Sequence, residues 1–424
     1  MGQTGAASVN GAGRADIADI QADVVVVGAG MVGGALAVAL AGAGIRVALI
    51  DRADPRALTS EGRDGRASAI ALGSQRALSG VGVWDHVGAA EPILDIRVTD
   101  ADAPGFLHYD HRELGENGDA APGFGHIVEN TILRRAIWAR ACDLPALGVF
   151  APAELAALER GRDAVTARLA DGRQIVAALA VSAEGRDARL RREAGIAVTE
   201  WTYPQTGIVC TVGHERPHGG LAHEHFLASG PFASLPMTGN RSSIVWTERT
   251  ALAPAALALD DDAFSAELQR RFGDWLGRVR VEGGRWSYPL GLMHAERYID
   301  HRLALVGDAA HLIHPVAGQG LNLGLRDVAA LAETIVDARR LGIDIGLSAT
   351  LERYQRWRRV DNLTLIAVTD GLNRLFSTDF APVALARRIG MAAVENMPGL
   401  KRLFMRHAMG TVGELPRLVA GQML

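Results

Sequence analysis

Three glycines and an acid near the start of this 424-residue chain have the types and spacing that hold a dinucleotide. Gly28, Gly30 and Gly33 form a GxGxxG pattern, and Asp51 follows 23 positions after Gly28. In a strand–turn–helix unit the first glycine permits a tight turn, the second lets the backbone approach a pyrophosphate, and the third allows close packing of helix on strand. The positive end of the helix dipole then faces the phosphate charge. Asp51 is placed to accept hydrogen bonds from an adenosine ribose, and its charge disfavours a 2′-phosphate.

A second polar segment late in the chain favours FAD over NAD. The apolar run 303–306 predicts a short strand that ends at Gly307 and Asp308, and glycines recur around Asn322. A carboxylate at such a strand end can hold the hydroxyls of an extended ribityl chain. A helix beginning near Gly320 would direct its free N–H groups at a flat ligand, where they stabilise the negative charge that a flavin gains on reduction.

Longer motifs carry a resemblance to a known family. They are DGRASAIAL at 64–72, GHIVEN at 125–130, GP and LP at 230–236, VWT at 245–247, GDAAH at 307–311 and HPVAGQGLNLGLRD at 314–327. The chain resembles class A flavoprotein monooxygenases of the para-hydroxybenzoate hydroxylase fold, and most of all the hydroxylases of ubiquinone biosynthesis. The resemblance runs from about residue 23 to the C-terminus. GxGxxG and GD are shared by the whole class, whereas the run at 314–327 points to the quinone branch.

The resemblance assigns roles residue by residue. Gly28, Gly30, Gly33 and Asp51 would hold the ADP half of FAD, and Arg66 and Asn130 would line the flavin. Asp308 would bind the ribityl chain, while Gly320, Leu321 and Asn322 would face the pyrimidine edge. The backbone carbonyl of Pro315 would lie near substrate and flavin. The sequence assigns no other catalytic residue, and it names no base that activates a phenol.

The resemblance also implies a reaction. NAD(P)H would reduce FAD, O₂ would form a C4a-hydroperoxide on the flavin, and one oxygen atom would pass to the aromatic ring of a polyprenylated phenol. A lipid tail implies an apolar channel and delivery by a membrane or by a protein complex of ubiquinone biosynthesis. We expect a cytoplasmic protein with peripheral contact at the inner membrane. Two alternatives stay open: a class A flavoprotein for another apolar substrate, and a non-catalytic FAD-binding assembly protein.

One segment departs from the class pattern GADGxxSxxR. The chain reads SAEGRDARLR at 182–191, so Glu184 replaces the aspartate and Ala188 the serine, while Arg191 is kept. Glu184 is still assigned to cofactor binding. The departure concerns how the nicotinamide is handled.

The elements that must position these residues define an α/β fold. The apolar blocks 24–27 and 46–50 predict two buried strands around an alanine-rich helix over 34–43. We predict a Rossmann-like FAD-binding domain with an inserted, mostly β substrate domain and C-terminal helices. The predicted ranges are a disordered tail at 1–20, an FAD domain at 21–92, 124–197 and 284–340, a substrate domain at 93–123 and 198–283, and a helical region at 341–424.

Composition excludes several other classes of protein. The single lysine, Lys401, leaves no P-loop and makes a Schiff-base enzyme implausible, while a net charge of −4 speaks against a nucleic-acid partner. Two distant cysteines form no disulfide framework, in keeping with a reducing compartment.

Three further patterns allow competing interpretations. The uncharged run 24–45 is long enough to span a bilayer, but its glycine pattern favours the strand–turn–helix unit. The His223–Glu224–His225 run and the His311/His314 pair do not match a metal-site spacing, so no metal is expected. Residues 383–409 form basic helical stretches, broken at Pro398, that either lie on a membrane or partner or pack on the chain's own FAD domain.

Overall fold

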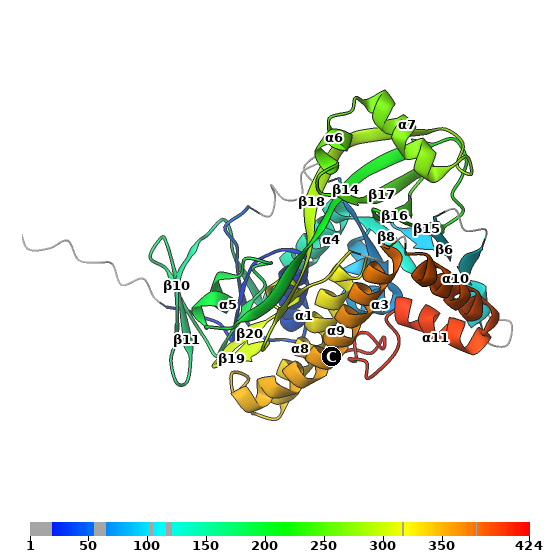
Figure 1. The fold of residues 1–424 in the computed structure, drawn as a ribbon. Coiled ribbons are helices and arrows are strands. Elements are labelled where there is room, and N and C mark those ends of the chain that lie inside the picture. Colours follow the sequence, from blue (N-terminus) through cyan, green and yellow to red (C-terminus); the bar gives the residue numbers. More distant parts are fainter. Residues whose placement is uncertain (1–18, 55–64, 102–104, 116–120, 316–317, 379) are drawn as a thin grey trace, which may run out of the picture.

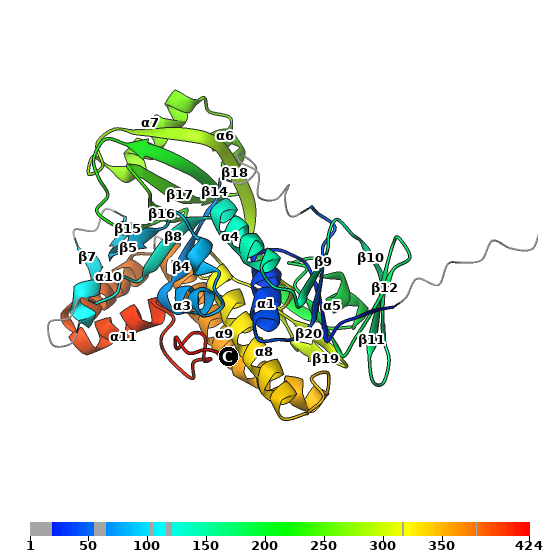
Figure 2. The ribbon, with the colours of Figure 1, turned by 180° about the vertical axis from the view of Figure 1, so that it is seen from behind.

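The computed structural model describes residues 19–54, 65–101, 105–115, 121–315, 318–378 and 380–424. Of the tail expected at 1–20, all but the last two residues lie outside this part of the chain. Figures 1 and 2 show a helix-covered body, which contains the two glycine segments, and a large twisted sheet above it.

The body is built on a six-stranded, largely parallel sheet. Its order is β19 (Ile299–Asp300), β20 (Leu303–Leu305), β13 (Leu179–Ser182), β2 (Val24–Val27), β3 (Val47–Ile50) and β9 (Leu147–Phe150). All pairs are parallel except β19 with β20. The four valines of β2 are buried, as expected for a central parallel strand. Three of the predicted elements, β2, β3 and β20, are therefore confirmed.

Helices pack beside this sheet and bring the two glycine segments together. Helix α1 (Met31–Gly42) follows β2, as predicted, and contacts both α4 (Asn130–Cys142) and α8 (Gly320–Arg340). Shorter helical elements are α3 (Leu72–Gly80), α5 (Arg189–Glu193), η1 (Trp84–His86), η2 (His111–Leu114) and η3 (Gly307–Ala309).

Two small sheets flank the body. One has the order β1 (Ile20–Gln21), β12 (Gln174–Ala177), β11 (Val165–Leu169) and β10 (Leu155–Arg160). The other has the order β4 (Ala67–Ala71), β8 (Gly125–Glu129) and β5 (Glu91–Ile93), and its strand β4 contacts α8.

The large sheet has eight strands. Their order is β21 (His311–Leu312), β18 (Val279–Ala295), β14 (Val198–His214), β17 (Arg241–Arg249), β16 (Gly230–Met237), β15 (Leu221–Leu227), β6 (Asp95–Asp100) and β7 (Phe106–Asp110). Strand β18 runs through the boundary predicted at 283/284 and pairs with β21, so one sheet joins the inserted region to the second glycine segment. The division into domains remains a proposal.

The two faces of the large sheet meet different helices. Helices α6 (Ala253–Leu257) and α7 (Asp261–Phe272) lie on one side, and the C-terminal helices lie on the other (Figures 1 and 2). Those are α9 (Ser348–Phe376), α10 (Ala381–Asn396) and α11 (Pro398–Ala408), with the predicted break at Pro398. We call the face toward the C-terminal helices the inner face.

The C-terminal helices contact more than the FAD domain. Helix α10 packs on β7, and α11 contacts η2, while Met405 of α11 also packs against Leu72 of α3. Across the described ranges, no helix is long and apolar enough to cross a membrane.

Candidate active site

The first glycine segment forms a tight loop at the carboxyl end of β2. Gly28 has φ +106°, and its N–H donates to the Ile50 carbonyl at 2.8 Å. A Cβ on Gly33 would lie 1.9 Å from the Gly28 oxygen, whereas a Cβ on Gly30 would meet nothing within 4 Å. Gly28 and Gly33 therefore serve the loop's own packing. Gly30 leaves the backbone open at the start of α1, where a pyrophosphate would be favoured.

Asp51 stands at the end of the neighbouring strand β3. Its carboxylate accepts the Ala29 N–H at 2.5 Å and the Ala53 N–H at 2.7 Å. The side chain thus holds the glycine loop in place. Its contact with an adenosine ribose remains a proposal.

The second glycine segment lies beside the first. Helix α8 approaches α1 so closely that a Cβ on Gly324 would lie 2.7 Å from Val32 of α1. On η3, Asp308 remains accessible to solvent, although surrounding protein desolvates its carboxyl and raises its pKa. Arg66 and His311 act in the opposite direction on the pKa of Asp308, so both lie near it.

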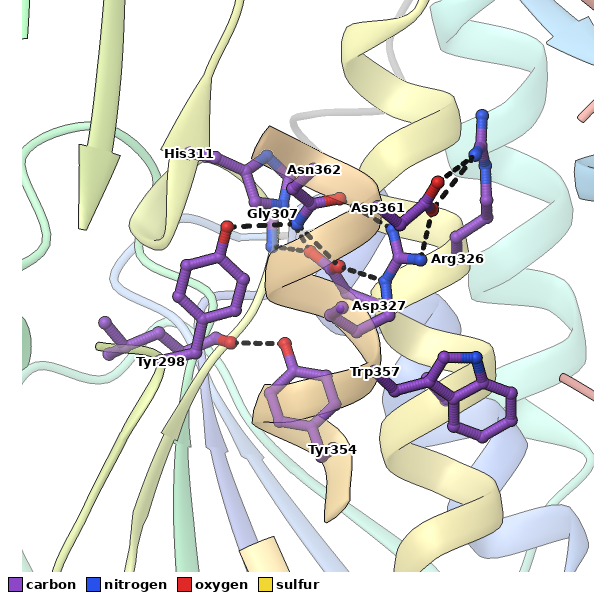
Figure 3. A network of polar contacts seen from close by, with 12 residues as sticks. Tyr298, Gly307, His311, Arg326, Asp327, Tyr354, Trp357, Asp361 and Asn362 are labelled. Atoms are coloured by element: carbon purple, nitrogen blue, oxygen red, sulfur yellow. Dashed lines mark hydrogen bonds and ion pairs between the residues drawn. The ribbon is translucent and has the colours of Figure 1, made fainter. Parts of the chain in front are cut away.

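A buried network fixes this segment from behind (Figure 3). The Asp327 carboxylate accepts the Gly307 N–H at 3.0 Å and lies 2.6 Å from Nε2 of His311. Arg358 of α9 donates to Asp327 at 2.8 Å and to Asn362 at 2.7 Å. The network therefore ties the turn at Gly307 to both long helices. The sequence shows Asp327 only as the last residue of the motif at 314–327. Its structural role was not predictable, because its partners on α9 lie more than 30 positions away.

The side-chain amide of Asn322 makes three hydrogen bonds within the protein, and its predicted place at the pyrimidine edge of the flavin remains a proposal. Its Oδ1 accepts the Ala71 N–H at 2.9 Å, and its Nδ2 donates to the carbonyls of Ala69 at 2.8 Å and Gly318 at 3.2 Å. The amide thus joins β4 to the start of α8. The backbone N–H groups of Gly320 and Leu321, in the first turn of α8, have no intrahelical acceptor and are the groups suited to a flavin edge.

Arg66 and Asn130 meet where β4 joins β8. The Asn130 N–H donates to the Arg66 carbonyl at 3.0 Å, and Ser68 donates to the Asn130 side chain at 2.6 Å. The Arg66 guanidinium lies 5.0 Å from the ring centroid of Tyr288, on the large sheet. The pair therefore stands between the glycine segments and the inner face.

The departing segment at 182–191 is locally self-contained. Glu184 accepts hydrogen bonds from Ser182 at 2.8 Å and from the Leu190 N–H at 3.0 Å. Arg191 donates to the Ala309 carbonyl at 2.9 Å, next to Asp308. Glu184 thus shapes its own loop, and Arg191 connects that loop to the second glycine segment.

Pro315 and the histidines before it occupy the edge of the same segment. The Pro315 carbonyl accepts the Gly318 N–H at 2.9 Å, and the His314 ring packs edge-on against Tyr203. Among the described residues no group of three or more His, Cys, Asp or Glu side chains is arranged to hold a metal ion.

A dinucleotide fits this arrangement. The open backbone at Gly30, the ends of the parallel strands, Asp308 and the start of α8 lie at the carboxyl edge of the molecule's parallel sheet. A family model described as an FAD binding domain matches residues 21–359. The chain belongs to this FAD-binding family. FAD is therefore its cofactor, as the glycine segments predicted.

Similar proteins place the chain more closely within the family. It is 57% identical over 408 residues to the ubiquinone hydroxylase UbiL of Rhodospirillum rubrum, covering 95% of this chain and 94% of the relative. It is 36% identical over 391 residues to the 3-demethoxyubiquinol 3-hydroxylase of Escherichia coli, covering 92% and 98%. The predicted membership of the FAD-dependent hydroxylases of ubiquinone biosynthesis is confirmed.

Solved structures confirm the fold. The p-nitrophenol 4-monooxygenase PnpA of Pseudomonas putida superposes with a TM-score of 0.76 at 18% identity, covering 93% of this chain and 100% of that one. HpxO of Klebsiella pneumoniae, solved with FAD and uric acid, gives a TM-score of 0.70 at 18% identity, covering 95% and 97%.

Proposed function

We propose that this FAD enzyme hydroxylates the aromatic ring of a polyprenylated phenol in ubiquinone biosynthesis, using NAD(P)H as a transient reductant and O₂ as co-substrate. The observation that carries the proposal is the 57% identity to a ubiquinone hydroxylase across 95% of the chain. The juxtaposition of both glycine segments with the inner face supports it, because substrate and flavin must meet there.

FAD, when bound, supplies the redox and oxygen chemistry, and the protein supplies position. Gly28, Gly30 and the start of α1 would hold the pyrophosphate, and Asp308 the ribityl chain. The first-turn N–H groups of α8 would hold the pyrimidine edge. The Asp327 network would keep the turn at Gly307 and helix α8 fixed during turnover, since both are tied to a buried ion pair.

Anaerobic reduction of the purified holoenzyme tests this function. NADH or NADPH is mixed with the protein with and without a short-tailed prenylphenol, and O₂ labelled with heavy oxygen is then admitted. We expect flavin bleaching that accelerates with the phenol, followed by one labelled oxygen atom in the ring. Nucleotide oxidation with no labelled product would favour a different apolar substrate. Bound FAD that neither nucleotide bleaches would favour the non-catalytic assembly protein.

We further propose that the enzyme collects its lipid-tailed substrate at an anionic membrane surface. Two of the basic residues in 383–409 are buried in ion pairs: Arg387 with Asp100, and Lys401 with Glu113 and Glu395. Apolar side chains instead dominate what α10, α11 and the turn before them expose. This C-terminal apolar face comprises Phe380, Leu385, Ile389, Met397, Leu403 and Phe404, with Arg388 and Arg402 also exposed.

Vesicle sedimentation tests the membrane proposal. We expect the holoenzyme to sediment with phosphatidylglycerol vesicles and more weakly with phosphatidylcholine vesicles, since apolar burial and positive charge act together. Ile389→Glu with Phe404→Glu should abolish sedimentation, whereas Leu341→Glu, at an exposed leucine outside this face, should not. Absence of sedimentation with both vesicles would overturn the proposal and favour delivery within a protein complex.

A further inference from the structure

The run His223–Glu224–His225 on β15 divides between the two faces of the large sheet. His223 and His225 both lie within hydrogen-bonding distance of Thr99, at 2.9 and 2.6 Å, and His223 packs edge-on against Trp275 beside α7. Both histidines therefore point to the outer face of the sheet, the face on which α6 and α7 lie. Since side chains alternate along a strand, Glu224 points to the inner face.

The strand neighbours of Glu224 place it between two contacts. On one side Ala222 belongs to an apolar cluster against which Ala69 of β4 also packs, and β4 is the strand that Asn322 joins to the start of α8. On the other side Phe226 stacks on Phe376 of α9, with ring centroids 3.9 Å apart. Glu224 thus lies between the flavin-binding segment and the end of α9, on the face where the proposed substrate must lie.

Directly across the sheet, Glu224 has apolar neighbours. It pairs in register with Ala233 of β16 and with Val98 of β6, so its own row of the inner face carries no partner for a carboxylate. Within the described part of the chain, its carboxyl makes no hydrogen bond or ion pair. The residue is half-buried, and the surrounding protein desolvates its carboxyl.

Three charged groups on the surrounding elements, Asp100, Asp370 and Arg66, have other partners. Asp100 of β6 pairs with Arg387 of α10, and Asp370 of α9 accepts a hydrogen bond from Tyr203. Tyr109 on β7 is partly buried beside Ile96, and its pKa is raised by desolvation and by Glu395. Arg66 lies over Tyr288. Burial alone accounts for the raised pKa of Glu224, which is about 7.

We propose that the Glu224 carboxylate lies in the substrate site and accepts the proton of the ring hydroxyl during hydroxylation. The oxygen–hydrogen bond of the phenol breaks, the proton moves to a carboxylate oxygen, and the electron pair stays on the ring oxygen. The ring thereby becomes richer in electrons at the carbons that accept oxygen. The carbon that has received oxygen then loses its hydrogen as a proton to solvent, and its electron pair restores the aromatic ring. Glu224 finally returns the first proton to the ring oxygen. This inference rests on the proposed function.

The pH dependence of Glu224→Gln tests the inference. In the wild type, ring hydroxylation should fall as pH drops below about 7, because the base becomes protonated. The glutamine variant should hydroxylate on the order of 100-fold more slowly, with this acid limb absent, since a general base contributes roughly 10²–10⁴-fold. FAD content and the rate of flavin reduction should be unchanged. Glu282→Gln, at an exposed glutamate of β18, is the matched control and should behave as the wild type.

A substrate-side experiment on the wild type removes dependence on the variant's folding. The O-methyl ether of the same phenol has no proton to give, so it should be hydroxylated about as slowly as the phenol is by Glu224→Gln. Equal hydroxylation rates for phenol and ether would overturn the role of Glu224 but not the proposed function. A Glu224→Gln variant that keeps the wild-type rate and the acid limb would do the same. A wild type that hydroxylates no phenol would overturn the proposed function and this inference together.

Discussion

At the scale of single residues, Glu224 should destabilise the fold it belongs to. Its pKa rises from 4.5 to about 7 on folding, so the folded chain keeps a proton that the unfolded chain loses. Stability therefore falls as pH rises through this window, and the cost is complete above about pH 7. Glu224→Gln should stabilise the protein at pH 8, on the order of 1–3 kcal/mol, and have little effect near pH 4. Urea midpoints at both pH values provide the measurement.

The matched variant Glu282→Gln makes the same change of charge as Glu224→Gln, but at an exposed position of the same sheet. Its urea midpoints should stay close to those of the wild type at both pH values, because surface substitutions usually change stability by less than about 0.5 kcal/mol. If both variants gave the same shift at pH 8, net charge would be the cause, and the desolvated position of Glu224 would be contradicted.

Substitutions at two glycines of the GxGxxG motif should have different effects, one on stability and one on FAD binding. Gly33→Ala would place a Cβ 1.9 Å from the Gly28 oxygen, so the apoprotein itself should lose about 1–3 kcal/mol of stability. Gly30→Ala meets no protein atom within 4 Å, so the apoprotein should keep its stability while FAD binds at least about tenfold more weakly, a loss of about 1.4 kcal/mol. Thermal unfolding of apoprotein and FAD titration separate the two effects.

Gly42→Ala, also in α1 and also with open space, should change neither quantity appreciably and serves as the control. A Gly30→Ala protein that binds FAD as tightly as the wild type would show that the pyrophosphate does not approach this backbone.

At the scale of elements, Asp327 joins α8, α9 and the turn at Gly307. Burial raises the pKa of this carboxyl, but His311 and Arg358 outweigh it and hold the pKa at about 2. Asp327→Asn would leave the buried Arg358 with Asp361 as its remaining carboxylate partner and should cost about 3 kcal/mol, the low end for a broken buried pair. Asp337 lies on α8 like Asp327, in a more exposed pair with Arg353 of α9. Asp337→Asn should therefore cost less than about 1 kcal/mol. Denaturant unfolding of both apoproteins at neutral pH measures the difference.

The sign of the pH effect follows from the lowered pKa. The contribution of Asp327 is present above its unfolded value of 3.8 and is lost as pH falls toward about 2. The gap between wild type and Asp327→Asn should therefore stay constant from about pH 5 to 8 and narrow only in acid. A gap that narrowed near pH 7 would assign the effect to a different group.

Local sequence signals sufficed for the elements around the first glycine segment. The valine block, the glycine spacing and the alanine-rich stretch each determine structure within a few residues, so β2, α1 and β3 were predictable. The hydrogen bonds of the Asn322 side chain were not predictable, because they go to β4, about 250 positions earlier in the chain. The direction of Glu224 was equally hidden, since it depends on the parallel register of β15 with β6, which no local pattern specifies.

At the scale of the whole molecule, the C-terminal helices close the inner face of the large sheet. The closure rests on Arg387 of α10, whose guanidinium donates to the buried Asp100 of β6 at 2.7 Å. Arg387→Leu would leave Asp100 buried without its main partner, at a cost of about 3–5 kcal/mol. The helices should then open locally, so hydrogen exchange should increase in α10, α11 and the end of α9 but not in α1 or β2.

The same variant should separate reduction of the flavin from oxygenation of the substrate. The glycine segments that are proposed to hold FAD lie in the body and should stay intact, so NAD(P)H should still bleach the flavin. Water would then reach the inner face around Glu224, and the yield of hydroxylated ring per nucleotide should fall severalfold. Arg388→Leu, at the exposed neighbour 3.8 Å from Asp100, should leave yield and exchange unchanged. Asp100→Leu combined with Arg387→Leu removes both buried charges and should restore the closed state, because an apolar pair replaces a buried ion pair at little cost. A double variant as uncoupled as Arg387→Leu alone would show that the charge itself, rather than the closure it secures, is what the reaction needs.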